Sequence, residues 1–315
     1  MKFSIIKESY TGSVPEITFG KNRKVSFGGE KSLPFLFFEG EHPHKPLISF
    51  EVQDSPPQDY PKELAKVYSS VWDDPVRWAK LCESFGAEAI ALRLMSIHPD
   101  TTDAKAEDVA DKLKKFLNEI DLPLIILGCN HTEKDAEVLP IVSDVARGFN
   151  CIIGKAQEGN YKTIAASAMA GGHSLIAMSE LDVNLAKQLN ILITQMGFPA
   201  NKLIIDPMCS ALGYGFEYTY SVMERIRIAG LIQGDPMLSS PMVADVGFYV
   251  WKTKETQAED ENSQWGSLHE RGIIWEAVTA CSFLLSGAEL LIMRHPEAVN
   301  LVKYFIEDLI STKEK

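Results

Sequence analysis

Short apolar runs recur along the chain from residue 46 onward. Most of them are followed by a longer stretch in which apolar residues return every three or four positions. Apolar runs of about four to eight residues are typical of buried strands, whereas the three-to-four-residue repeat is typical of helices that bury one face. Eight runs have the first character, at residues 47–54, 89–95, 123–130, 151–157, 174–180, 203–209, 242–248 and 290–296. We interpret each as the strand of a repeating strand–helix unit.

The stretches between these runs predict the helices. Helical patterns cover residues 75–86, 106–120, 133–147, 182–197, 216–226, 270–287 and 296–310. Asp182 is expected to cap one helix at its N-terminus, and Gly197 is expected to end it. Eight such units predict an α/β fold, the (β/α)8 or TIM barrel, over residues 46–315, a length that suits this fold. A doubly wound open sheet fits less well, because no glycine-rich turn follows the first strand.

Residues 1–45 have a different pattern and are predicted to form a separate N-terminal β extension. Apolar and polar residues alternate there, the apolar members being Phe3, Ile5, Ile17, Phe19, Val25 and Phe27. This alternation predicts short antiparallel strands, a hairpin added to the barrel rather than another strand–helix unit.

Composition narrows the function. The formal net charge of −12 disfavours nucleic acids and anionic membranes as partners, because both are bound by clustered Lys and Arg. No window is apolar for the ~18 residues that a membrane helix needs, and the first residues contain no apolar signal segment. We therefore expect a cytoplasmic protein. The five cysteines are widely spaced without a CxxC pair, which argues against a zinc knuckle or an iron–sulfur cluster and favours buried, reduced thiols.

In a (β/α)8 barrel, function is located at the C-terminal ends of the strands. Polar residues stand at the ends of all the predicted strands, namely Gln53, Asp54, Arg93, Asn130, His131, Gln157, Ser179, Glu180, Asp206, Asp245, Arg294 and His295. Polarity resumes at any strand end, so this observation alone leaves each residue about as suited to a structural role as to a functional one. The charges of Asp54, Asp206, Asp245 and Arg294 directly close or interrupt apolar runs, so they are expected to have partners.

Motifs for metal binding, phosphate binding and nucleophilic catalysis are missing from the sequence. It contains no HExxH, EF-hand loop, GxSxG elbow or Walker loop, and no GxGxxG that follows a strand. Hydrolase, kinase and dehydrogenase functions therefore have no positive support, and we name no catalytic residue and no metal site.

The stretch 203–227 contains an unusual loop. A short apolar run ends at Asp206, and Tyr214 lies between Gly213 and Gly215 just before a predicted helix. Glycines allow a ligand to approach the backbone closely, and a tyrosine ring offers a flat amphipathic surface. The loop would suit a large planar ligand or a protein surface. It could also be an ordinary tight loop with its tyrosines packed inside.

Seven segments, in order along almost the whole chain, resemble the small subunit of the corrinoid iron–sulfur protein, also called the delta subunit of the acetyl-CoA decarbonylase/synthase complex. They are LPFLFFEGE (33–41), SFEVQD (49–54), EGNYKTIAASAM (158–169), LDVNLAKQLNILI (181–193), IIDPMCSALGYGFEYTYSVMERIR (204–227), ERGIIWEAVTA (270–280) and LLIMRHPEAV (291–299). The N-terminal 30 residues, Cys209-Ser210 and the segment 252–266 resemble the family least.

The resemblance implies a (β/α)8 barrel that forms a heterodimer with a large corrinoid iron–sulfur subunit. In this family the large subunit carries the iron–sulfur cluster and holds the nucleotide tail of the corrinoid (cobalamin-like) cofactor, and the small-subunit barrel covers the corrin ring. The heterodimer carries a methyl group from methyltetrahydrofolate:corrinoid methyltransferase to CO dehydrogenase/acetyl-CoA synthase in the reductive acetyl-CoA (Wood–Ljungdahl) pathway of carbon fixation. The chain lacks the DxHxxG motif by which other corrinoid proteins give a histidine to cobalt. It is thus expected to share the corrinoid with the large subunit and to hold no iron–sulfur cluster.

The residues expected to face the corrinoid are taken from the strand ends and the glycine loop. They are Asp54, Asn130, Gln157, Asp206, Leu212, Gly213, Tyr214, Gly215, Asp245, Arg294 and His295. Two other functions stay open. Pterin-binding barrels hydrogen-bond the pterin through Asp and Asn at strand ends, so Asn130, Asp206 and Asp245 would also suit a stand-alone methyltransferase. The third possibility is a purely structural scaffold subunit.

Overall fold

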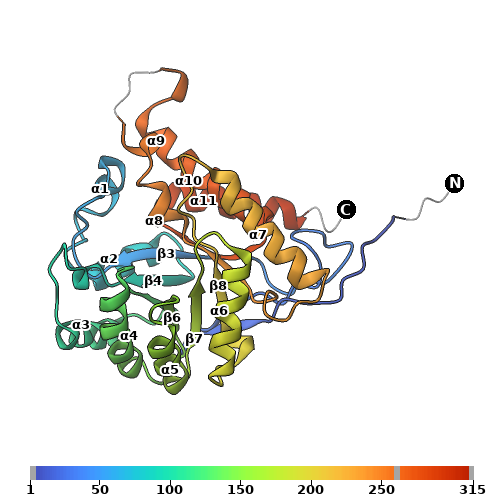
Figure 1. The fold of residues 1–315 in the computed structure, drawn as a ribbon. Coiled ribbons are helices and arrows are strands. Elements are labelled where there is room, and N and C mark those ends of the chain that lie inside the picture. Colours follow the sequence, from blue (N-terminus) through green and yellow to red (C-terminus); the bar gives the residue numbers. More distant parts are fainter. Residues whose placement is uncertain (1–4, 259–262, 312–315) are drawn as a thin grey trace.

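A computed structural model describes residues 5–258 and 263–311. Its centre is a closed barrel of parallel strands (Figure 1) in the order β10-β3-β4-β5-β6-β7-β8-β9. The strands are β3 (Leu47–Gln53), β4 (Ala89–Arg93), β5 (Leu124–Leu127), β6 (Ile152–Ala156), β7 (Ser174–Met178), β8 (Leu203–Asp206), β9 (Met242–Ala244) and β10 (Ala288–Met293). Each falls within or beside one of the eight apolar runs, so the predicted (β/α)8 barrel is confirmed.

Helices surround the barrel and connect its strands. They are α1 (Lys62–Tyr68), α2 (Pro75–Ser84), α3 (Ala106–Glu119), α4 (Thr132–Val145), α5 (Tyr161–Gly171), α6 (Val183–Gln195), α7 (Phe216–Leu231), α8 (Val246–Val250), α9 (Lys254–Gln257), α10 (Leu268–Leu285) and α11 (Pro296–Ser311). The Asp182 side chain caps α6 as expected, because its Oδ1 accepts hydrogen bonds from the backbone of Asn184 and Leu185 at 2.6 and 3.0 Å. Gly197, just beyond α6, has a φ of +91°, which glycine adopts without strain.

The expected N-terminal hairpin is present and covers one end of the barrel. Strands β1 (Ile17–Phe19) and β2 (Val25–Phe27) pair antiparallel. Phe19 and Phe27 are fully buried and belong to the same apolar cluster as the inward-facing residues of the barrel strands. The hairpin is tied to the residues just before β6, since Gly20 N donates to Asn150 O at 2.9 Å. It therefore closes the N-terminal end of the barrel and leaves the opposite end for the strand-end residues.

Two parts of the predictions fall outside the described residues. Phe3, which was expected in the hairpin region, lies in the undescribed 1–4, and the segment 252–266 is described except for 259–262. Within the described ranges, no helix is both long and apolar enough to cross a membrane. Four of the five cysteines are buried as expected, and Cys281 is half-buried.

Candidate functional site: a closed charge network beneath the barrel rim

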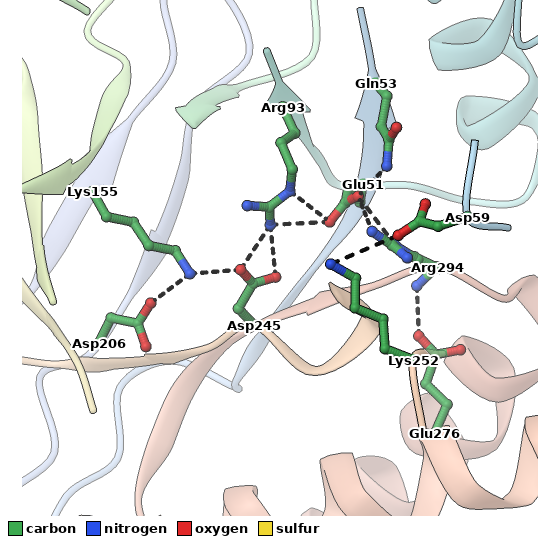
Figure 2. A network of polar contacts seen from close by, with 10 residues as sticks. All are labelled: Glu51, Gln53, Asp59, Arg93, Lys155, Asp206, Asp245, Lys252, Glu276 and Arg294. Carbon is green, nitrogen blue, oxygen red and sulfur yellow. Dashed lines mark hydrogen bonds and ion pairs between the residues drawn. The ribbon is translucent and has the colours of Figure 1, made fainter. Parts of the chain in front are cut away.

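Six charged side chains meet inside the barrel, at the end where its strands finish (Figure 2). They are Glu51, Arg93, Lys155, Asp206, Asp245 and Arg294, which come from or directly follow β3, β4, β6, β8, β9 and β10. Each is at most 1% exposed. Three are acidic and three are basic, so their formal charges cancel within the group. Buried charges are tolerated only when they are paired in this way.

Neighbouring ion pairs share a residue, so they form one chain of contacts across the inside of the barrel. Lys155 Nζ lies 2.8 Å from Asp206 Oδ2 and 2.6 Å from Asp245 Oδ2. Arg93 Nη2 binds both carboxylate oxygens of Asp245 at 2.9 and 2.7 Å, and its Nε donates to Glu51 Oε2 at 3.1 Å. Planar guanidinium groups suit such forked contacts with carboxylates.

Glu51 joins this chain of ion pairs to the last barrel strand. Arg294 Nη2 donates to Glu51 Oε1 at 2.6 Å, and the side-chain amide of Gln53 donates to the same oxygen at 3.2 Å. Burial alone would raise the pKa of Glu51, but attraction to Arg294 and Arg93 outweighs it and lowers the pKa. Burial likewise opposes ionisation of Asp245, and attraction to Arg93 and Lys155 holds its pKa well below the usual range. Both carboxyl groups are therefore ionised at neutral pH.

Helix α8 covers the network from the rim side. The centre of the Phe248 ring lies 4.3 Å from the Arg93 guanidinium carbon and 3.6 Å from Lys252 Nζ. Lys252 in turn reaches Asp59 Oδ2 at 3.7 Å. An aromatic face over a cation is a stabilising arrangement, most of all where water is excluded. The barrel mouth is thus filled by paired charges and capped by an aromatic ring.

A further buried carboxylate, that of Glu276, fixes the residues after β10. Glu276 on α10 accepts hydrogen bonds from the backbone of Arg294 at 2.6 Å and of His295 at 3.0 Å, and from Trp251 Nε1 at 2.9 Å. Burial raises the pKa of Glu276 to about 7. The His295 ring stacks on Trp251 with 5.8 Å between ring centres, and burial lowers the pKa of His295 to about 4. His295 is a neutral packing residue at physiological pH.

The structure separates the predicted site residues into buried and accessible ones. Asp206, Asp245 and Arg294 belong to the network, and all three have the partners that the sequence argument required. Asp54 is also buried and partnered, since its Oδ1 accepts from Ser96 N at 2.8 Å, so it fixes the turn after β4. None of these four side chains reaches the surface, and His295 is equally buried.

The predicted residues that do reach the rim lie in its loops. Asn130 and Gln157 are half-buried, and Asn130 has a positive φ of +67°. Tyr214 is 85% exposed, so it is not packed inside a tight loop. Gly213 beside it is exposed, with a φ of +91°.

The other two members of the glycine loop are buried. Gly215 lies directly before α7. The Leu212 side chain is only 4% exposed and belongs to the main hydrophobic core, so little of it reaches the surface. An aliphatic side chain next to the core gains more from burial than from a polar rim.

Sequence reasoning missed Glu51, Lys155 and Glu276. Glu51 stands between Phe50 and Val52 inside an apolar run, and side chains alternate faces along a strand. The available signal was therefore a charge at an inward-facing position of a strand predicted to be wholly buried. Among the described residues, no group of three or more His, Cys, Asp or Glu side chains is placed to hold a metal ion.

The fold and the site define a parallel (β/α)8 barrel whose mouth is occupied by its own ion pairs. A sequence model described as "CO dehydrogenase/acetyl-CoA synthase delta subunit" matches residues 16–305. The acetyl-CoA decarbonylase/synthase complex subunit delta of Archaeoglobus fulgidus is 34% identical, over 96% of this chain and 70% of that protein. The subunit of the same name from Methanocaldococcus jannaschii is 32% identical, over 94% and 74%. The chain belongs to the CO dehydrogenase/acetyl-CoA synthase delta subunit family.

Solved structures with a similar fold include dihydropteroate synthases. The enzyme of Xanthomonas albilineans, in complex with indole-2-carboxylic acid and 6-chloroguanine, has a TM-score of 0.59 at 12% identity, over 94% of this chain and 99% of that one. The 7,8-dihydropteroate synthase of Vibrio fischeri gives the same TM-score and identity, over 95% and 99%. At this identity the likeness concerns the fold alone.

Proposed function

We propose that the chain is the small subunit of a heterodimeric corrinoid iron–sulfur methyl carrier, in which its barrel rim covers a corrinoid bound mainly by a large subunit. One observation carries the proposal beyond family membership. The strand-end charges Arg93, Asp206, Asp245 and Arg294 are bound within the buried network beneath α8. At the centre of the mouth the chain therefore offers a closed surface rather than free catalytic groups.

The accessible rim has the character that a planar cofactor requires. Tyr214 presents an exposed ring, and Gly213 next to it allows close approach to the backbone. When bound, the corrinoid supplies the cobalt that accepts and donates the methyl group. The role of this chain is to exclude water and oxidants from one face of the corrin ring and to surround that face with protein groups in fixed positions. Asn130, Gln157, Gly213 and Tyr214 are the predicted residues that we retain for this contact.

The same role defines the partners. The chain binds the large subunit, which holds the iron–sulfur cluster, and the heterodimer meets in turn the methyltetrahydrofolate:corrinoid methyltransferase and CO dehydrogenase/acetyl-CoA synthase. We place these encounters in the cytoplasm. They deliver and remove the methyl group of the reductive acetyl-CoA pathway.

The geometry gives little support to the alternative function, a stand-alone pterin-binding methyltransferase. It needs Asp206 and Asp245 to be free for hydrogen bonds to a pterin, yet both are ion-paired with Lys155 and neither is exposed. Opening the site would leave these charges unpaired, which is costly. The similarity to dihydropteroate synthases supports the fold and carries no argument about the ligand.

Reconstitution of the heterodimer tests the proposal. The chain is co-expressed with the large subunit, and cobalt retention, the visible corrinoid spectrum and the rate of methyl transfer are compared with those of the large subunit alone. We expect the chain to change the spectrum, slow cobalt loss and support transfer. Identical cobalt retention and spectra with and without it would leave only the scaffold role. Demethylation of methyltetrahydrofolate by the isolated chain with free cobalamin would establish a stand-alone methyltransferase instead.

A further inference from the structure

A cleft on the rim separates the glycine loop from the segment that follows β9. It has a volume of about 300 Å³ and is lined on one side by Ser210 and residues 212–214, and on the other by Tyr249 and residues 252–255. The two walls are close, because a Cβ added to Gly213 would lie 3.6 Å from the Thr253 methyl group and 3.9 Å from Glu255 Oε2. These are ordinary contact distances, and it is the φ of +91° that favours glycine at this point.

Glu255 has an unused acceptor in this cleft. Its Oε2 is shielded from solvent and has no hydrogen-bond partner among the described residues. A buried acceptor without a donor costs roughly 1–3 kcal/mol and calls for an explanation, such as a ligand that supplies the donor. This oxygen lies 3.9 Å from the position that a Gly213 Cβ would take, so the acceptor belongs to the wall of the cleft that faces Gly213.

Donors line the same cleft. Lys252 and Lys254 have exposed side chains, and the half-buried Tyr249 carries a phenolic hydroxyl. An inserted group is therefore offered an acceptor from one residue and donors from others. A carboxylate would meet repulsion from Glu255, and an ammonium group would meet repulsion from the two lysines. A primary carboxamide satisfies both, since its NH2 donates and its carbonyl oxygen accepts.

We propose that this cleft binds a primary carboxamide arm at the edge of the corrin ring, with Glu255 accepting from the amide NH2 and the surrounding lysine or tyrosine donors binding its carbonyl. Corrin rings of the cobalamin type carry acetamide and propionamide arms around their edge. The inference rests on the proposed function, and it makes the cleft an anchor that sets the rotation of the ring beneath Tyr214. It also gives residues 252–255, which belong to the segment 252–266 that resembles the family least, a part in selecting the corrinoid.

The test uses the reconstituted heterodimer and two kinds of probe, cobalamin and the separated isomers in which one propionamide of cobalamin is hydrolysed to a carboxylic acid. We expect one isomer to bind at least about tenfold more weakly than cobalamin, because its carboxylate would face Glu255. The Glu255→Gln variant should restore that isomer to within about threefold of cobalamin. Glu180→Gln, a carboxylate that lines a different rim cleft, is the matched control and should leave the discrimination intact.

Two comparisons separate this inference from the proposed function. The large subunit alone is titrated with the same probes, and the discrimination that is assigned to Glu255 must be absent there. If this chain alters corrinoid retention but Glu255→Gln leaves every isomer ratio unchanged, the cleft assignment is wrong and the covering role stands. If the chain alters neither retention nor spectrum, both proposals fail together. Unfolding midpoints of both variants, expected to match wild type, exclude a general loss of structure.

Discussion

Lys155 Nζ lies between the carboxylates of Asp206 and Asp245, 2.8 Å from an oxygen of the first and 2.6 Å from an oxygen of the second. These residues come from β6, the end of β8 and the residue after β9, so one ammonium group joins three units of the barrel. Burial favours loss of the Lys155 proton, but attraction to Asp206 and Asp245 outweighs burial and raises the pKa of the lysine. The Lys155 ammonium group therefore stays charged and remains paired with both carboxylates.

Replacement of Lys155 by methionine should strongly destabilise the fold. The variant keeps the volume but leaves Asp206 without its cation and Asp245 with Arg93 alone. Removing one partner of a buried ion pair typically costs about 3–5 kcal/mol, to be measured by urea unfolding at pH 7. The control is Lys80→Met, which breaks a surface pair with Glu119 and should cost no more than about 1 kcal/mol. Similar losses in both variants would show that the interior network contributes no special stability.

A double variant tests whether the cost comes from unpaired charge. In Lys155→Met with Asp206→Asn, the asparagine oxygen can still accept the Met208 N–H that Asp206 Oδ1 binds at 2.8 Å. We expect the double variant to be more stable than Lys155→Met alone, with a coupling energy of about 1–3 kcal/mol in the mutant cycle. Strictly additive losses would mean that packing, and not charge pairing, explains the effect of the lysine.

The sequence was sufficient for the barrel but not for its interior. Periodicity identifies strands and helices because it reports which faces are buried, and Asp182 could be recognised as a cap from its type and place. It could not show that Glu51 meets Arg294, since the closure of β10 onto β3 brings together residues far apart in the chain. Helix α5 was not predicted from periodicity because alanines and glycines give it little contrast between faces.

The rim loops were harder still to predict. Leu212 and Tyr214 are separated by one residue, yet one is buried in the core and the other is 85% exposed. The turn between them depends on the positive φ of Gly213 and on hydrogen bonds such as that from Tyr214 N to Ala211 O at 3.3 Å. Residue type alone therefore places the loop on the rim without showing which of its side chains faces outward.

Glu289 should contribute a component of stability that decreases as pH rises from 5 to 8. Burial raises the pKa of Glu289 from an ordinary value of 4.5 to about 8, although Arg227 acts in the opposite direction. Between these values the folded state binds more protons than the unfolded state. The stabilisation is thus complete below pH 4.5 and is lost as pH rises toward 8.

Glu289→Gln removes this titration and should shift the slope of stability against pH in the positive direction, by up to about 1.4 kcal/mol per pH unit. Urea unfolding at pH 5, 6, 7 and 8 measures the slope independently of the absolute cost of the substitution. Glu41→Gln is the control, because the pKa of this exposed group is lowered by its hydrogen bond to Lys31 and its titration lies below the window. An unchanged slope in Glu289→Gln would show that Glu289 is ionised throughout.

Tyr214→Ala should impair methyl transfer without weakening the fold. The ring is 85% exposed, so its removal exposes no core, and the unfolding free energy should stay within about 0.5 kcal/mol of wild type. If the ring covers the corrinoid, the reconstituted variant should lose cobalt faster and transfer the methyl group about two- to tenfold more slowly, since an aromatic contact contributes about 0.5–1.5 kcal/mol. Tyr304→Ala removes a ring that is 77% exposed on the outer helix α11, and it should change neither property. Normal transfer by Tyr214→Ala would place the corrinoid contact elsewhere on the rim, and a large loss of stability would mean that the loop supports the barrel.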